Sequence, residues 1–158
     1  MRFPNFVFVH HDIWDTLHNP TGTLQACDVR LPAGDDSIDL IILQSVFTHM
    51  FPDEIVHYMK EFRRILKPTG RVWATFFIVH QGILDAVRNK AQTEYALSFQ
   101  HDYRFGCYIN TLDEPRGAVA FEEDAMKQLI GRADLTLARP ILWGTWSGQR
   151  PDPKCGQD

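Results

Sequence analysis

Apolar residues along the chain fall into short runs and helical stripes that predict alternating strands and helices. Residues 3–10 are mostly aromatic and β-branched, with a continuous apolar run at residues 6–9. They predict a strand that is covered on both faces and ends at Asp12. The run Ile38–Leu43 contains a single Asp among branched apolar residues, which predicts a buried, central, parallel strand. Turn residues separate the two runs, so we expect two distinct elements.

A helix and a further strand are predicted after the second run. Pro52 is suited to the first helical position, and two acidic residues follow it where negative charge meets the positive end of the helix dipole. Pro68 and Gly70 are expected to end the helix before a buried strand at residues 72–79. The order strand, helix, strand with short links predicts parallel pairing in a βαβ unit. The helix has one apolar stripe, formed by Ile55, Val56, Met59, Phe62, Ile65 and Leu66.

The downstream half predicts further pieces of the same kind. We expect a helix within residues 80–96 and two short extended pieces around a loop, with residues 97–121 forming an insertion or lid. Residues 122–132 predict another helix, and residues 135–143 a strand that Pro140 restricts to an edge. The whole chain, residues 1–158, is expected to be a single partial domain.

Composition and charge narrow the class of protein. The 158 residues are 44% hydrophobic and 23% charged, which is typical of one globular domain. The sequence contains no apolar run of spanning length and no signal peptide pattern, so we expect a cytoplasmic protein. A net charge of −4 without a basic stripe argues against nucleic acid and membrane partners. Three widely spaced cysteines without a CxxC motif favour reduced thiols.

Polar side chains follow the Ile38–Leu43 run, over residues 44–49. Ligands of open α/β sheets bind at the carboxyl ends of strands, so this segment is a candidate site. His49 is a candidate general base, because an ordinary imidazole titrates near neutral pH. The alternative for Ser45 and Thr48 is that their hydroxyls only cap the helix that begins at Pro52.

A metal site is not expected. His10, His11 and Asp12 form the most suggestive group of metal-binding residue types. Adjacent residues of a strand point to opposite faces, so the two histidines would not face one ion in regular β geometry. Trp143 and Trp146 are expected to pack at the sheet edge rather than to form a substrate cage.

The βαβ segment resembles the downstream half of a class I S-adenosylmethionine-dependent methyltransferase. LPAGDDSIDLIILQSVFTHM, then a helix, then RRILKPTGRVWATFF follow the family's order of motifs, with Ile38 for the usual Phe and Thr69 for the first Gly of the last motif. The resemblance covers residues 3–79 and, more loosely, the helix from Glu122 and the strand after it. It implies an α/β fold with a Rossmann-like, mostly parallel sheet and flanking helices.

The resemblance also implies roles for individual residues. Asp12 would accept a hydrogen bond from the adenine amino group of the cofactor S-adenosylmethionine, and the backbone amide of Ile13 would face the adenine ring. Residues at the end of the first βαβ strand would lie against the methionine part, namely Gln44, Ser45 and Val46. Phe47 and His49 would line the passage between the methyl group and the acceptor. Apart from the resemblance, the aromatic residues of the 97–121 segment are candidates to cover an acceptor pocket, namely Tyr103, Phe105 and Tyr108.

Two motifs of the family are missing from the sequence. There is no GxGxG loop before the βαβ unit and no acidic residue to hold the ribose hydroxyls, and the tail stops where the family enters its last strand. The fold is therefore expected to be incomplete. With the family's first two strands absent, residues 6–10 would lie roughly 14 Å from the Ile38 strand. Three outcomes stay open: another chain supplies the missing strands, residues 6–10 pair directly with that strand, or this end is loose.

The function implied is transfer of the methyl group of S-adenosylmethionine to a small-molecule acceptor. The reaction would be an in-line displacement in which catalysis comes mostly from positioning. The alternative is a non-catalytic interaction module that no longer binds the cofactor. Its exposed sheet edge would pair with another chain.

Overall fold

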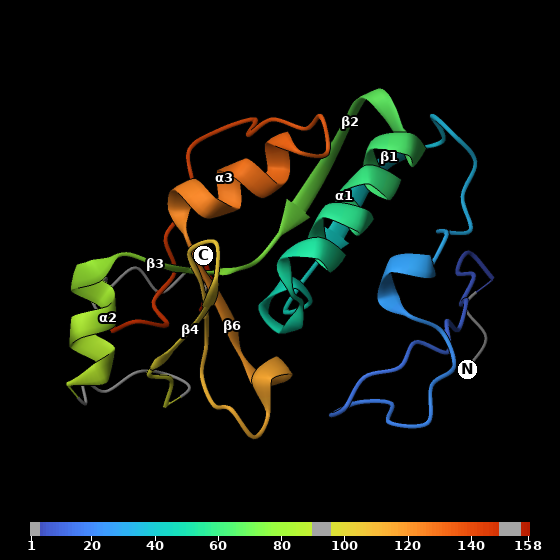
Figure 1. The fold of residues 1–158 in the computed structure, drawn as a ribbon. Coiled ribbons are helices and arrows are strands. Elements are labelled where there is room, and N and C mark those ends of the chain that lie inside the picture. The colour runs from blue at the N-terminus through green and yellow to red at the C-terminus, as the bar shows by residue number, and fades with distance from the viewer. Residues whose placement is uncertain (1–3, 90–95, 149–155) are drawn as a thin grey trace.

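The computed structural model describes residues 4–89, 96–148 and 156–158, which form an α/β arrangement with two sheets (Figure 1). In the first sheet, β1 (Ile38–Leu43) pairs in parallel with β2 (Leu66–Ala74). The second sheet is mixed, and its strand order is β3 (Phe77–Val79), β6 (Val119–Glu122), β5 (Cys107–Ile109) and β4 (His101–Arg104). The helices are η1 (Ala26–Asp28), η2 (Phe47–His49), α1 (Pro52–Ile65), α2 (Gln81–Arg88), η3 (Pro115–Gly117) and α3 (Glu123–Gly131).

The predicted βαβ unit is confirmed as β1, α1 and β2. α1 begins at Pro52, and the Glu54 carboxylate accepts a hydrogen bond from the Phe51 amide at 2.9 Å, which satisfies a donor at the helix start. α1 ends just before Pro68 and Gly70, as expected. These two residues lie in an irregular part of β2, because the register moves from Ile38–Leu66 to Leu40–Arg71.

The single strand expected over residues 72–79 is wrong, because it divides into β2 and β3, which belong to different sheets. Between β2 and β3, the backbone of Phe76 forms two reciprocal hydrogen bonds with the backbone of Asp158. The Phe76 amide donates to the Asp158 carbonyl at 2.9 Å, and the Asp158 amide donates to the Phe76 carbonyl at 3.0 Å. Residues 156–158 therefore separate the two sheets at this point.

Most of the downstream predictions agree with the structure. The helix predicted over residues 122–132 is confirmed as α3, and the helix expected within residues 80–96 is α2, with residues 90–95 outside the described part. The two short extended pieces are β4 and β5, which pair antiparallel. Cys107 and Ile109 of β5 are buried in the core, so this segment contributes to packing; its origin as an insertion or lid stays a prediction.

Two predicted strands are wrong. In the segment 4–10 the structure has no strand, and the exposed side chains include Val7 at 89%. The apolar run has high β propensity, but no described strand lies beside it to pair with, so it gains neither hydrogen bonds nor burial. Residues 135–143 are also irregular, in keeping with Pro140, which lacks the amide a ladder needs.

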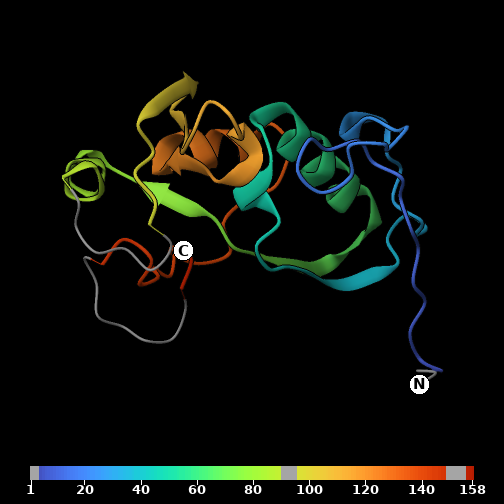
Figure 2. The same cartoon turned by 90° about the horizontal axis from the view of Figure 1, so that it is seen from below.

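Among the described residues, β1 pairs with β2 alone and is covered on one face, so the prediction of a central, fully buried strand is wrong. Leu40 is 55% exposed and Ile42 63% exposed, and Trp73, which is paired with Ile42, is also partly exposed. Figure 2 shows α1 and α3 on one side of the strands and no helix on the other side of β1 and β2. Parallel strands are normally covered on both faces, so this open apolar face is unusual.

The core has two clusters. One packs α1 and α3 against both sheets around Phe47, Phe76 and Phe121, and the other lies between α2 and the second sheet around Phe99 and Trp146. Within the described ranges, every helix is too short or too polar to cross a bilayer. A cytoplasmic location stays a prediction.

Candidate functional site

The carboxyl end of β1 is tied to the end of β2 and to the end of the chain. The Ser45 amide donates to Thr75 Oγ1 at 2.9 Å, and both hydroxyls donate to Gln157 Oε1, at 3.0 Å from Ser45 and 2.7 Å from Thr75. Ser45 has a φ of +55°, a conformation that costs a non-glycine residue roughly 1–2 kcal/mol. The hydrogen bonds hold this turn in place, with Gln44 and Val46 on either side exposed.

In η2, which follows, the side chain of the predicted site residue Phe47 points into the core. Phe47 is fully buried, and its ring packs 5.2 Å from that of Phe76 and 6.1 Å from that of Phe62. This placement gives no support to the expected role of Phe47 in lining an open passage. The next residue, Thr48, is also buried, and its hydroxyl has no hydrogen-bond partner within the described part of the chain.

His49, the predicted base, is half-buried and held at one ring nitrogen. Its Nδ1 lies 2.8 Å from the backbone carbonyl oxygen of Arg116. A carbonyl only accepts hydrogen bonds, so Nδ1 must carry the proton and donate. In the neutral ring the lone pair is then on Nε2, which is the nitrogen that can accept a proton. The ring of His18 stands edge-on to it at 5.5 Å.

Arg116 is the centre of a half-buried charged network that the sequence pattern did not predict. Its guanidinium donates two hydrogen bonds to Glu54, at 2.8 and 2.6 Å, and Nε lies 3.4 Å from Asp15 Oδ2. The three side chains are only 14%, 13% and 17% exposed, in the order Arg116, Glu54, Asp15. The guanidinium also lies over the Phe51 ring at 4.6 Å. The hydrogen bonds with Glu54 raise the pKa of Arg116, so it stays charged.

Asp15 links this network to the N-terminal loop. Partial burial raises the pKa of its carboxyl group, but hydrogen bonds from the amide and ring of His18 and from the Leu17 amide, together with the charge of Arg116, lower it below the ordinary value. The contacts are 2.8 Å to the His18 amide, 2.9 Å to His18 Nδ1 and 3.0 Å to the Leu17 amide. Asp15 is therefore ionised at neutral pH.

Asp12 and Ile13 lie in the same loop, upstream of Asp15. Asp12 Oδ1 accepts one hydrogen bond from Asn19 at 3.0 Å, and Oδ2 accepts from the hydroxyl and the amide of Thr23 at 2.8 and 3.2 Å. The hydrogen bond from Asn19, then that from the Thr23 hydroxyl, lower the pKa of Asp12. Ile13 forms a backbone bridge with Leu24. These contacts close the loop on itself, and the roles of Asp12 and Ile13 toward adenine stay predictions.

Tyr103 and Tyr108, the predicted acceptor residues, come together at a hollow of about 220 Å³ along the β4–β5 hairpin. The Tyr103 ring stacks on Phe51 at 4.6 Å, next to the Arg116 network. Tyr108 donates its hydroxyl hydrogen to Glu122 at 2.7 Å, and this hydrogen bond raises the pKa of Tyr108 to about 12. Phe105 lines the same hollow.

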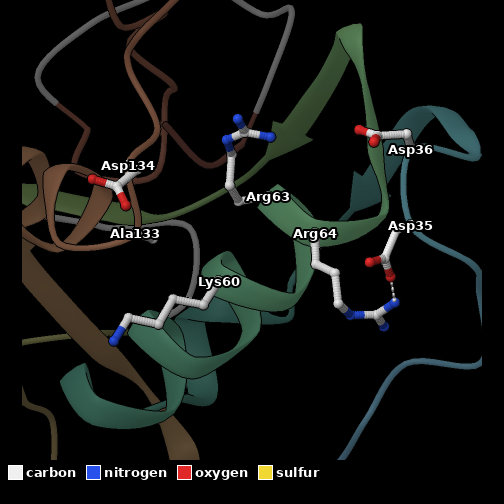
Figure 3. Close-up of a pocket in the computed structure, with 7 residues that line it drawn as sticks. All are labelled: Asp35, Asp36, Lys60, Arg63, Arg64, Ala133 and Asp134. Atoms are coloured by element: carbon white, nitrogen blue, oxygen red, sulfur yellow. Dashed lines mark hydrogen bonds and ion pairs between the residues drawn. The ribbon is translucent and has the colours of Figure 1, made fainter.

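A second hollow, of about 360 Å³, lies at the far end of α1 (Figure 3). Arg64 points toward Asp35 and bonds to it at 2.8 Å, whereas Lys60 and Arg63 point away from that pair. The predicted site is at the carboxyl end of β1, before α1 begins, so this hollow is separate from it.

The described residues fit part of an S-adenosylmethionine molecule. Among the described residues, Asp12 Oδ1 accepts a hydrogen bond from Asn19, and a carboxylate oxygen has a second lone pair of the kind that an adenine amino group requires. Gln44 and Val46 are exposed at the strand end expected to meet the methionine part. Ser45 is less available, because its amide and hydroxyl already have partners within the chain. The sequence contains no GxGxG motif.

Comparison with known proteins identifies the same segment. Residues 11–74 match a family model described as a methyltransferase domain, and the match spans the Asp12 loop, β1, α1 and all of β2. No solved structure matches the chain. The mixed α/β arrangement with three α-helices in the described part is compatible with a Rossmann-like methyltransferase fold, and this family typically uses S-adenosylmethionine. Residues 11–74 therefore carry the sequence pattern of a methyltransferase domain, in agreement with the resemblance of the βαβ segment.

Proposed function

We propose that the protein transfers the methyl group of S-adenosylmethionine to a small-molecule acceptor, with His49 as the general base. One observation carries this proposal. Within the matched segment 11–74, at the carboxyl end of a parallel strand, an imidazole is held with Nδ1 protonated and Nε2 left as the proton acceptor.

The chain would contribute binding, orientation and a proton acceptor. The bound cofactor supplies an electrophilic methyl group. Asp12 would accept a hydrogen bond from the adenine amino group, the Ile13 amide would face the adenine ring, and Gln44, Ser45 and Val46 would lie along the methionine part. His49 Nε2 would take the proton that the acceptor's hydroxyl or amine loses as its oxygen or nitrogen is methylated. A positioned base of this kind contributes about 10²–10⁴-fold in rate.

The acceptor is proposed to enter over the β4–β5 hairpin. Tyr103 and Tyr108 line one hollow there, and Tyr103 stacks on Phe51, whose ring also lies under Arg116. The hollow measures about 220 Å³, below the roughly 300–1,000 Å³ of drug-sized ligand pockets, so it would hold a small acceptor or part of a larger one.

Calorimetric titration of the chain with S-adenosylmethionine tests the proposal. We expect saturable binding that Asp12→Ala weakens by about 1–3 kcal/mol, the scale for loss of a charged hydrogen-bond partner. Asp113→Ala, which removes an exposed carboxylate elsewhere, serves as the matched control and should bind like the wild type. Absence of binding by the wild-type chain would overturn the cofactor assignment, and equal binding by Asp12→Ala would remove Asp12 from the site.

The second candidate function, a non-catalytic interaction module, is favoured by the open face of the first sheet. β2 is the only strand paired with β1 in the described part of the chain, and Leu40 and Ile42 are exposed beside the unpaired edge. We propose that a second copy pairs antiparallel with the β1 edge, so that a two-fold axis places Leu40 and Ile42 of the two copies next to each other on one continuous sheet face. Light scattering after size exclusion tests this. A dimer that Leu40→Thr with Ile42→Thr converts to monomer would support it, and a wild-type monomer at high concentration would refute it.

A further inference from the structure

The half-buried network around Arg116 joins two parts of the proposed site that are distant in sequence. The Asp15 end belongs to the loop that holds Asp12, and the backbone carbonyl of Arg116 holds His49. Glu54 completes the network from the first turn of α1. One residue therefore contacts both the loop expected at the adenine end and the imidazole expected at the reacting end.

The way Arg116 is held restricts where its carbonyl can lie. Two parallel hydrogen bonds to Glu54 fix the plane of the guanidinium, and Phe51 supports it from one face. Residue 116 is in η3, which leads directly into β6, where Val119, Ala120 and Phe121 are fully buried. The backbone at Arg116 is thus fixed by its own side chain and by a buried strand, and it can hold His49 in one tautomer.

We infer that Arg116 is a positioning residue, which orients His49 through its carbonyl and couples that orientation to the Asp12 loop through Asp15. This inference rests on the proposed function. It predicts that a less firmly held guanidinium changes the tautomer of His49 directly and, as a consequence, lowers the affinity for the cofactor. Lysine at this position keeps the charge but not the two-pronged contact with Glu54, so Arg116→Lys is the informative change.

The tautomer of His49 is measurable without any activity. In nitrogen NMR spectra of the chain with ¹⁵N-labelled histidine, at a pH of about 8 where an ordinary imidazole is neutral, we expect wild-type His49 to be protonated at Nδ1. Arg116→Lys should give a mixture of tautomers and weaken binding of S-adenosylmethionine by about 2- to 30-fold, the range for changes along a coupled network. Arg132→Lys, at an exposed arginine 4.0 Å from Asp53, is the matched control and should change neither.

The outcomes separate this inference from the proposed function. If Arg116→Lys leaves the His49 tautomer unchanged, the positioning role is refuted, whatever the affinity. If the tautomer changes while neither wild type nor variant binds S-adenosylmethionine, His49 is positioned as inferred but the cofactor assignment fails. Should Arg116→Lys not fold, Glu54→Gln removes the charge opposite Arg116 and keeps a side chain of the same shape, and the same spectra decide.

Discussion

The ion pair of Glu61 with Arg64 offers a direct measure of how firmly the turn before β1 is held. Arg64 donates to both carboxylate oxygens of Glu61, at 2.9 and 2.6 Å, and also bonds to the carbonyls of Leu31 and Ala33 at 3.1 and 2.9 Å. Glu61 accepts from the Leu31 amide at 2.9 Å. The change Glu61→Gln removes the negative charge and keeps the shape of the side chain.

The magnitude follows from the pKa of Glu61. The hydrogen bonds from Arg64 lower this pKa from 4.5 to about 2, which sets a ceiling of roughly 3 kcal/mol at 1.36 kcal/mol per pH unit. The two side chains are 15% and 17% exposed, and solvent screening reduces the ceiling to about 1–2 kcal/mol. Because the folded-state pKa is the lower one, this stability is fully present above pH 4.5 and is lost as the pH falls toward 2.

Urea unfolding of wild type and Glu61→Gln across this range checks the reasoning. We expect a difference in unfolding free energy of about 1–2 kcal/mol at pH 7 that shrinks steadily below pH 4.5 and is near zero at about pH 2. The control is Glu123→Gln, which removes an exposed pair with Lys127 and should cost less than about 0.5 kcal/mol. A difference that does not vary with pH would show that packing, and not the charge, accounts for the effect.

Three further changes test the packing. Phe47→Ala removes a fully buried ring and should destabilise the chain by about 3–5 kcal/mol in urea unfolding, with a smaller loss contradicting its place in the core. Gly70→Ala puts a Cβ 2.9 Å from a carbonyl oxygen of β1 and should lower the melting temperature, whereas Gly131→Ala meets no atom within 4 Å and should not. Trp146→Phe removes a 2.6 Å hydrogen bond to Asp158 and should cost about 1–3 kcal/mol; an unchanged unfolding midpoint would show that the contact contributes nothing.

The βαβ unit was predictable because its signals are local. The stripe of α1, Pro52 at its start and the turn at Pro68 and Gly70 specify helix and strand from neighbouring residues alone. The run at residues 6–9 has equally strong β propensity, yet a strand also needs a partner at hydrogen-bonding distance, and propensity says nothing about that. The single strand predicted over residues 72–79 is wrong for a related reason, since Phe76, between β2 and β3, pairs with Asp158, which is distant in the sequence.

The candidate site was predictable in one part and hidden in another. His49 and the strand end before it were found because polar residues follow an apolar run at the edge where ligands bind. In the sequence, Arg116 lies within Asp-Glu-Pro-Arg-Gly, whose residue types indicate only a turn. Its partners are 62 residues away at Glu54 and still further at Asp15, so only the fold brings these charges together. The partial burial of Arg116 marks it as part of a network, and that burial is known only from the structure.

The position of Arg116 bears on how much of the site the family pattern covers. The pattern matches residues 11–74 and includes Asp15, His49 and Glu54, but Arg116 lies outside it. Without the carbonyl of Arg116, the His49 ring would have no acceptor among the described residues to fix its tautomer. Without the guanidinium, the carboxylates of Asp15 and Glu54 would be partly buried with no cation beside them, which is destabilising. The segment of η3 and β6 supplies both groups, because it places Arg116 in contact with His49, Asp15 and Glu54. The proposed base, His49, lies in the segment that matches a methyltransferase domain. In our inference, its orientation depends on Arg116, which lies outside that segment.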